Sequence, residues 1–301
     1  MIFGEHPAKD LYRQVVWGPY RRLLQAAPAG TEIRANRALG RLLSHVAMGR
    51  RLDLKNKLTS ALGPDKRLDS WVEECFETHI AQQYLGFSFA KIQRTNWHQY
   101  LHFEGLEKLD QALAKGQGVV IAHPHLGLPQ LPLHVLGLLG YDVHQVGGGQ
   151  NQVHLSPMGE WALGMRLALE GDICARCHDG KGYLRPLLRV LEANGVVLTA
   201  CDATGGGREI GRREMHQVLG QTIGLPLFPA WLAEKTGAVI LSMATWHDEG
   251  CQSITRLDPP IDGKPMEELA RRLERWLREH PGQWHFWDQW HGGEGGLLIR
   301  Q

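Results

Sequence analysis

Two polar side chains follow two apolar segments that have the character of buried strands. His125 follows the segment Val119–Ala122, and Asp202 follows the segment Val196–Ala200. In open α/β sheets the carboxyl ends of parallel strands meet at one edge, where ligands bind. We therefore expect His125 and Asp202 to converge in one cleft. Neutral imidazole near pH 7 is the natural general base, so this pair predicts proton-transfer chemistry.

The residues after His125 predict a turn and then a helix. Gly127 and Pro129 favour the turn, and residues 131–139 are apolar with their prolines confined to the first helical turn. Gln130 lies five positions beyond His125, at the start of this helix. His125 and Gln130 are thus predicted to flank one strand–helix junction.

Other motifs that could carry chemistry are weaker signals. The run Cys174-Ala-Arg-Cys177-His178 matches a haem-attachment pattern, but no export signal accompanies it and it falls in a short connector. A zinc site there would need a fourth ligand that the sequence does not place nearby. We therefore predict neither haem nor a metal site.

Two glycine-rich segments are candidates for binding an anion through backbone N–H groups. They cover residues 147–149 and 205–207, the second followed by Arg208. Neither matches the P-loop or the dinucleotide fingerprint, and both fit flexible active-site loops equally well.

Composition limits the class of protein. The chain has 301 residues, a net charge of +1 and five scattered cysteines. The near-zero charge argues against a nucleic-acid binder, and the cysteine pattern suits a reducing cytoplasm. Neither a signal peptide nor a transmembrane segment is expected, because no stretch of about 18 apolar residues occurs.

The segment 9–51 is basic and amphipathic, with nine Lys or Arg against two acidic residues. Apolar residues recur in it at helical spacing, beside Trp17 and Tyr20. Such helices bind anionic membrane surfaces, or they pack on a domain with the arginines in solvent. The sequence leaves both alternatives open.

The order of elements predicts an α/β fold with a central, mostly parallel sheet flanked by helices. Residues 1–100 are predicted to form an N-terminal helical cap on a core of residues 101–301, within one structural domain. Strands are expected at Val119–Ala122, Val143–Val146, Val196–Ala200, Ala238–Ala244 and Ser253–Leu257. Core helices are expected at Glu107–Lys115, Leu131–Leu139, Met158–Glu170, Tyr183–Ala193, Leu227–Lys235 and Met266–His280.

The segment from His125 to Gln130 resembles the His-x4-Asp/Glu motif of the bacterial lipid A late acyltransferases and phosphatidylinositol mannoside acyltransferases. Further segments resemble that family in order along nearly the whole chain: residues 50–56, 102–112, 165–166, 219–238 and 280–287.

The resemblance implies an enzyme that moves a fatty acyl group from an acyl carrier protein or acyl-CoA to a lipid or small-molecule acceptor. In that interpretation His125 is the general base that activates a hydroxyl or amine, and the acyl thioester is the co-substrate without a further cofactor. Asp202 and Gln130 complete the catalytic set, while Arg166, Gly127 and Arg208 bind substrate. The implied location is the cytoplasm, with peripheral contact of residues 9–51 at the inner membrane face.

Gln130 stands where the family has an acid. An amide oxygen orients an imidazole but does not neutralise an imidazolium, and losing a triad carboxylate costs about 10⁴ in rate. Either Asp202 serves His125 instead, or a more reactive substrate needs less help, or the protein is a weakened homologue that binds acyl chains or acyl carrier protein. Pro129 and Gln130 both depart from the family pattern, so we expect a site rebuilt around a neutral partner.

Overall fold

The computed structural model describes residues 7–146, 155–178, 182, 184–202, 212–248 and 252–290. Its centre is a seven-stranded sheet in which every neighbouring pair is parallel except β8 and β9. The strands, in spatial order, are β1 (Leu101–Glu104), β9 (Ser253–Leu257), β8 (Val239–His247), β2 (Val119–His123), β5 (Val196–Ala200), β3 (Val143–Val146) and β4 (Arg176–His178). The predicted α/β class is confirmed.

The central strands β2 and β5 are apolar because helices cover both of their faces. Every residue of β2 is buried, and Ile121 pairs with Leu198 of β5. The same register pairs His123 with Ala200. The segments that leave the two strands therefore start at the same level of the sheet.

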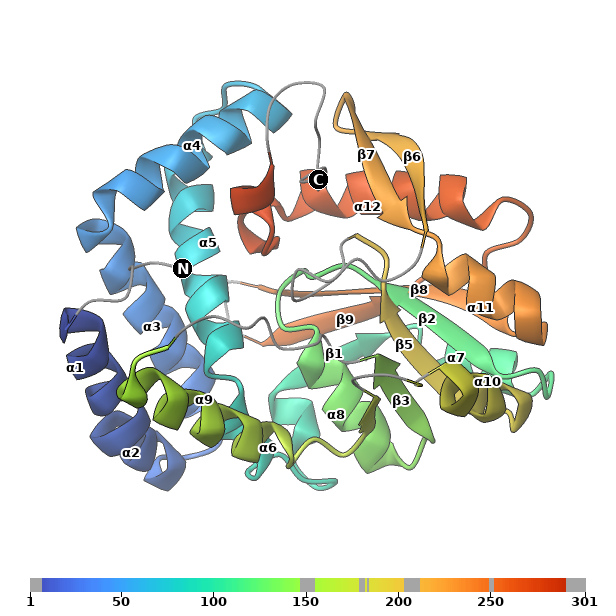
Figure 1. Ribbon diagram of the computed structural model, residues 1–301, viewed down its shortest axis with the longest axis horizontal. Helices are drawn as coiled ribbons and strands as arrows, with labels where there is room; N and C mark the ends of the chain where they lie inside the picture. The colour runs from blue at the N-terminus through green and yellow to red at the C-terminus, as the bar shows by residue number, and fades with distance from the viewer. Residues whose placement is uncertain are drawn as a thin grey trace.

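Helices lie on both faces of the sheet (Figure 1). Ile121 points into a cluster shared with α7 and α8, whereas Val120 points into a cluster shared with α10 and α11. The helix α12 lies on the α10–α11 side and contacts β8. These helices are α7 (Leu106–Leu113), α8 (Gln130–Leu139), α10 (Leu184–Glu192), α11 (Phe228–Thr236) and α12 (Pro265–Glu279).

The N-terminal helices stack along one side of the sheet (Figure 1). They are α1 (Pro7–Val15), a π-helical turn (Val16–Tyr20), α2 (Arg21–Ala26), α3 (Thr31–Val46), α4 (Met48–Leu62), α5 (Leu68–Gln83), α6 (Gly86–Phe89) and a 3-10 turn (Trp97–Gln99). One buried apolar cluster contains Trp17 and Phe76 from these helices together with Leu273 and Trp290 from the far end of the chain. The helix α9 (Pro157–Glu170) packs beside α1 and α6. The cap and the sheet thus share one core.

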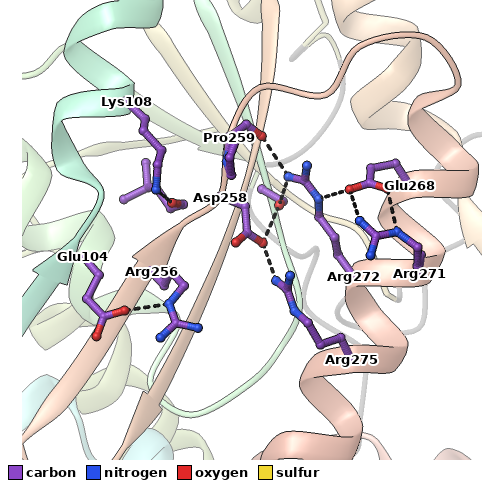
Figure 2. A network of polar contacts seen from close by, with 11 residues as sticks. Glu104, Lys108, Arg256, Asp258, Pro259, Glu268, Arg271, Arg272 and Arg275 are labelled. Carbon is purple, nitrogen blue, oxygen red and sulfur yellow. Dashed lines mark hydrogen bonds and ion pairs between the residues drawn. The ribbon is translucent and has the colours of Figure 1, made fainter.

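A polar network fixes α12 to the end of β9 (Figure 2). The Arg272 guanidinium donates to the Ser242 hydroxyl at 2.7 Å and to the Pro259 carbonyl at 2.9 Å. Arg275 donates to Asp258, and Glu268 accepts from Arg272. Arg272 and Asp258 are both buried. The bond of Arg272 to Glu268 and that of Asp258 to Arg275 offset the cost of removing the two buried charges from water.

The sequence did not predict β1, β4 or the hairpin of β6 (Arg213–Val218) and β7 (Gln221–Pro226). The edge strands β1 and β4 are four and three residues long, too short for a periodic pattern. The hairpin turn uses Leu219 at φ 50° and Gly220 at φ 75°, where Asn-Gly is the usual signal. The Leu219 N–H donates to a Glu274 carboxylate oxygen on α12 at 3.0 Å, which holds this unusual turn in place.

None of the helices in the described ranges is long and apolar enough to span a membrane.

Candidate active site

His125 and Asp202 are in direct contact. The His125 ring nitrogen Nδ1 lies 2.8 Å from Asp202 Oδ1, and the His125 backbone N–H donates to Asp202 Oδ2 at 2.7 Å. The paired register of β2 and β5 places these residues at the same edge of the sheet. The convergence expected from the sequence is therefore present in the structure.

Asp202 is fully buried, yet its surroundings favour the ionised form. Burial raises the pKa of a carboxyl group, but the charge and hydrogen bonds of His125 and the Trp284 N–H outweigh burial and hold the Asp202 pKa below its usual value. The Trp284 indole N–H donates to Oδ2 at 2.9 Å. Asp202 is thus a carboxylate near neutral pH.

The contact with Asp202 sets the tautomer of His125. A carboxylate is an acceptor, so Nδ1 carries the proton and Nε2 keeps the lone pair. The His125 side chain is 25% exposed, and the edge of the Phe286 ring packs on it with a centroid distance of 4.6 Å. Asp202 therefore sets the orientation of an imidazole that is partly open to solvent.

The C-terminal segment 281–286 runs against the turn that follows β2. The Gly127 N–H donates to the Gln283 carbonyl at 2.9 Å, and the His285 N–H donates to the His125 carbonyl at 3.0 Å. The His285 ring Nε2 donates to the Gly127 carbonyl at 2.7 Å. Both backbone polar groups of Gly127 are thus taken by protein partners. Gly127 has φ 59°, and a Cβ there would lie 2.4 Å from the Thr245 carbonyl oxygen, so the turn needs glycine.

Two further histidines near the dyad are held neutral. Burial, aided by the nearby His125, lowers the pKa of His285 to about 4, although the bond to Gly127 acts in the opposite sense. Burial also lowers the pKa of His123 to about 4. Neither side chain is protonated near pH 7, so neither adds a positive charge beside His125.

A cavity of about 510 Å³ lies between the N-terminal helices and α9. Trp17, Ile80 and Leu163 are among its apolar walls, and Phe286 lines it together with His285. Because the Phe286 ring packs on His125, the cavity reaches the immediate surroundings of the base. Its size and lining suit an apolar chain with a polar end.

The family model for bacterial lipid A biosynthesis acyltransferases matches residues 20–291. The chain belongs to this family. The predicted family is therefore confirmed, and acyl transfer is the chemistry that the family implies. No individual curated protein gives a significant match.

In this lipid A acyltransferase family member, Gln130 is hydrogen-bonded to a residue other than His125. Gln130 is the first residue of α8, and its side-chain amide oxygen Oε1 accepts a hydrogen bond from Gln82 Nε2 at 3.1 Å. The expectation of a neutral partner for His125 is wrong, because Asp202 from the neighbouring strand supplies a carboxylate. Gln82 lines the cavity, so the amide pair lies beside it.

The three residues that the sequence assigned to substrate binding have different outcomes. Arg166 lines the cavity and forms an ion pair with Glu170, its Nε 2.7 Å from the carboxylate. Gly127 shapes the turn, as described above. Arg208 and the glycine-rich segments 147–149 and 205–207 lie outside the described residues.

Within the described ranges, no group of three or more His, Cys, Asp or Glu side chains is arranged to hold a metal ion.

The site residues that sequence reasoning missed are Trp284, His285 and Phe286. They lie within the residues that the family model matches, but nothing in their local pattern indicates that they reach a turn about 160 residues earlier in the chain.

Proposed function

We propose that this protein transfers a fatty acyl group from a thioester, carried by acyl carrier protein or coenzyme A, to a hydroxyl or amine acceptor. The observation that carries the proposal is the His125–Asp202 pair, with Nδ1 2.8 Å from the buried carboxylate. Its position beside a largely apolar cavity, in a chain of an acyltransferase family, supports the same reaction.

His125 acts as the general base through Nε2. It takes the proton from the acceptor hydroxyl while the acceptor oxygen attacks the thioester carbonyl carbon. The tetrahedral intermediate collapses, the C–S bond breaks, and the imidazolium returns the proton to the leaving thiolate. Asp202 stabilises the imidazolium while it exists. The reaction needs no acyl-enzyme and no cofactor besides the thioester co-substrate.

The cavity holds the lipid part of a substrate. Apolar walls from the cap and α9 would take up an acyl chain, and each buried methylene contributes about 0.8 kcal/mol. Arg166, with its guanidinium partly exposed at this cavity, binds a polar or anionic group of the donor or acceptor.

The test is an acyl-transfer assay with acyl carrier protein and acyl-CoA donors, comparing the wild type with His125→Ala and Asp202→Asn. We expect Asp202→Asn to lower kcat by about 10³–10⁴ and His125→Ala to lower it at least as far. Asp142→Asn is the control and should retain wild-type rates. Asp142 is an exposed carboxylate directly before β3, which lies on the other side of β5 from β2.

Undiminished transfer by His125→Ala would contradict the mechanism. Tight binding of an acyl donor without any transfer by the wild type would instead identify a weakened homologue that binds acyl chains or acyl carrier protein.

We further propose that the cap contacts an anionic lipid surface on the cytoplasmic side. Leu42 and Val46 on α3, and Met48 and Leu52 on α4, are 61–65% exposed around the junction of the two helices. We call these four residues the junction patch. Arg50 and Arg51 lie in the same stretch, although each also forms an ion pair with an aspartate. Apolar side chains flanked by basic ones are typical of interfacial helices.

The cytoplasmic location agrees with the described cysteines, none of which forms a disulfide. Sedimentation with vesicles of phosphatidylglycerol and phosphatidylethanolamine tests the contact, with phosphatidylcholine vesicles for comparison. Val46→Glu with Met48→Glu should weaken binding at least tenfold, since each buried apolar side chain contributes about 1.5–3 kcal/mol. Met215→Glu, at an exposed methionine of β6, is the control. Equal loss in that control would refute the proposal.

A further inference from the structure

The indole of Trp284 contacts the carboxylate that serves His125. Trp284 is buried, and its Nε1–H donates to Asp202 Oδ2 at 2.9 Å. The same oxygen accepts the His125 backbone N–H, while Oδ1 faces the His125 ring. The two carboxylate oxygens are thus divided between distinct donors.

This division fixes the rotation of the carboxylate. With Oδ2 held by the Trp284 and His125 N–H groups, the plane of the Asp202 carboxylate is set and Oδ1 is aimed at Nδ1. Hydrogen bonds to a buried ionised group are worth roughly twice those between neutral groups. Loss of the indole donor would remove one of these bonds and weaken the hold on the orientation of the carboxylate.

The neighbouring indoles show that packing alone does not explain this contact. Trp284, Trp287 and Trp290 form a cluster of edge-to-face rings. The Trp287 N–H donates to the Pro281 carbonyl at 2.6 Å, and the buried Trp290 N–H has no partner among the described atoms. Of these three indoles, Trp284 is the one that is hydrogen-bonded to the dyad.

We propose that Trp284 is a positioning residue for acyl transfer, which holds the Asp202 carboxylate in the orientation that His125 requires. The proposal rests on the proposed function, since it assigns Trp284 a part in that same site. Trp284 acts through Asp202 and His125 and does not itself contact the reacting atoms.

The test compares Trp284→Phe with Trp290→Phe, a matched control that removes an indole of the same cluster without touching the dyad. A second form of the first variant carries benzothienylalanine at position 284, which keeps the bicyclic shape and replaces the N–H by sulfur. Two quantities are measured for each folded protein: kcat and KM for acyl transfer, and the low-field proton NMR resonance of the His125 Nδ1–H, assigned by its absence in Asp202→Asn.

We expect both position-284 variants to lower kcat about tenfold with KM within twofold, because one charge-assisted bond is lost while the cavity is unchanged. The low-field resonance should broaden or vanish in them and persist in Trp290→Phe. An unchanged resonance in the position-284 variants, or an equal loss of kcat in Trp290→Phe, would overturn the proposal. The resonance reports on the contact between Asp202 and His125 even if the wild type transfers no acyl group. Failure of the positioning role and failure of the proposed acyl transfer therefore give different results.

Discussion

At the scale of single residues, the site shows how a histidine can receive its carboxylate partner from a different strand. His125 leaves β2, Asp202 leaves β5, and the register of the two strands brings the side chains into contact. Gln130, on the helix that follows His125, is engaged with Gln82 instead. Asp202 therefore supplies the carboxylate that contacts His125, while residue 130 carries no charge.

Gln130→Glu should therefore leave kcat unchanged or lower it. Asp202 already occupies Nδ1 of His125, and a second carboxylate would place another negative charge near the cavity wall without a role in proton transfer. Steady-state acyl-transfer kinetics would measure the effect, with Gln130→Met as the control for loss of the amide contact. A tenfold gain in kcat for Gln130→Glu would mean that position 130 does reach the imidazole.

Sequence reasoning found His125 and Asp202 because each follows an apolar strand, a pattern that is local to a few residues. It assigned no site role to Trp284 or Phe286, because their contacts depend on how the C-terminal segment crosses the sheet edge. It named Asp202 as one possible partner of His125 but favoured a site rebuilt around a neutral partner, because one sequence does not show which side chain meets Nδ1.

At the scale of elements, the alternation of strands and helices after residue 101 was enough to predict the parallel sheet. The edge strands β1 and β4 escaped prediction because three or four residues carry no period, and the β6–β7 hairpin escaped it because its Leu-Gly turn is not a usual hairpin signal. The close packing of helices in the cap could not be predicted from the sequence either. Gly40 of α3 faces α5, where an added Cβ would lie 2.5 Å from the Phe76 carbonyl oxygen.

Gly40→Ala should lower the free energy of unfolding by about 2–3 kcal/mol, because α3 and α5 must move apart to admit the methyl group. Gly164→Ala is the matched control, since Gly164 lies within α9 with no atom within 4 Å of an added Cβ. That change should raise stability by about 0.5–1 kcal/mol. Urea unfolding measures both, and similar effects of the two substitutions would show that α3 and α5 are not in close contact there.

At the scale of the whole molecule, cap and sheet are stabilised by a common apolar core, so acid should unfold them together. His123, the last residue of β2, contributes to this acid sensitivity. Its pKa is about 4 in the folded state and about 6.5 when unfolded. Between these values the unfolded chain binds a proton that the folded chain does not, so stability is full above pH 6.5 and falls as the pH approaches 4.

At about 1.4 kcal/mol per pH unit, this group alone accounts for a loss of about 3 kcal/mol across that window. His123→Gln should lower by about one the number of protons taken up on unfolding, which is read from the slope of the unfolding free energy against pH. This holds whatever the effect of the substitution on stability at pH 7. The exposed His98 offers a control substitution, His98→Gln. An unaltered slope in His123→Gln would show that His123 is not held neutral.

The joining of the C-terminal segment to the turn after β2 also bears on when the protein becomes active as it folds. Asp202 lies 77 residues beyond His125, and the His285 ring reaches back 158 residues to Gly127. Loop-closure entropy delays contacts between distant parts of a chain. The cavity wall also depends on such contacts, because α9, His285 and Phe286 line it together with the N-terminal helices. A nascent chain would therefore complete the cavity and the His125–Asp202 pair at the same late stage, only after residue 286 has left the ribosome.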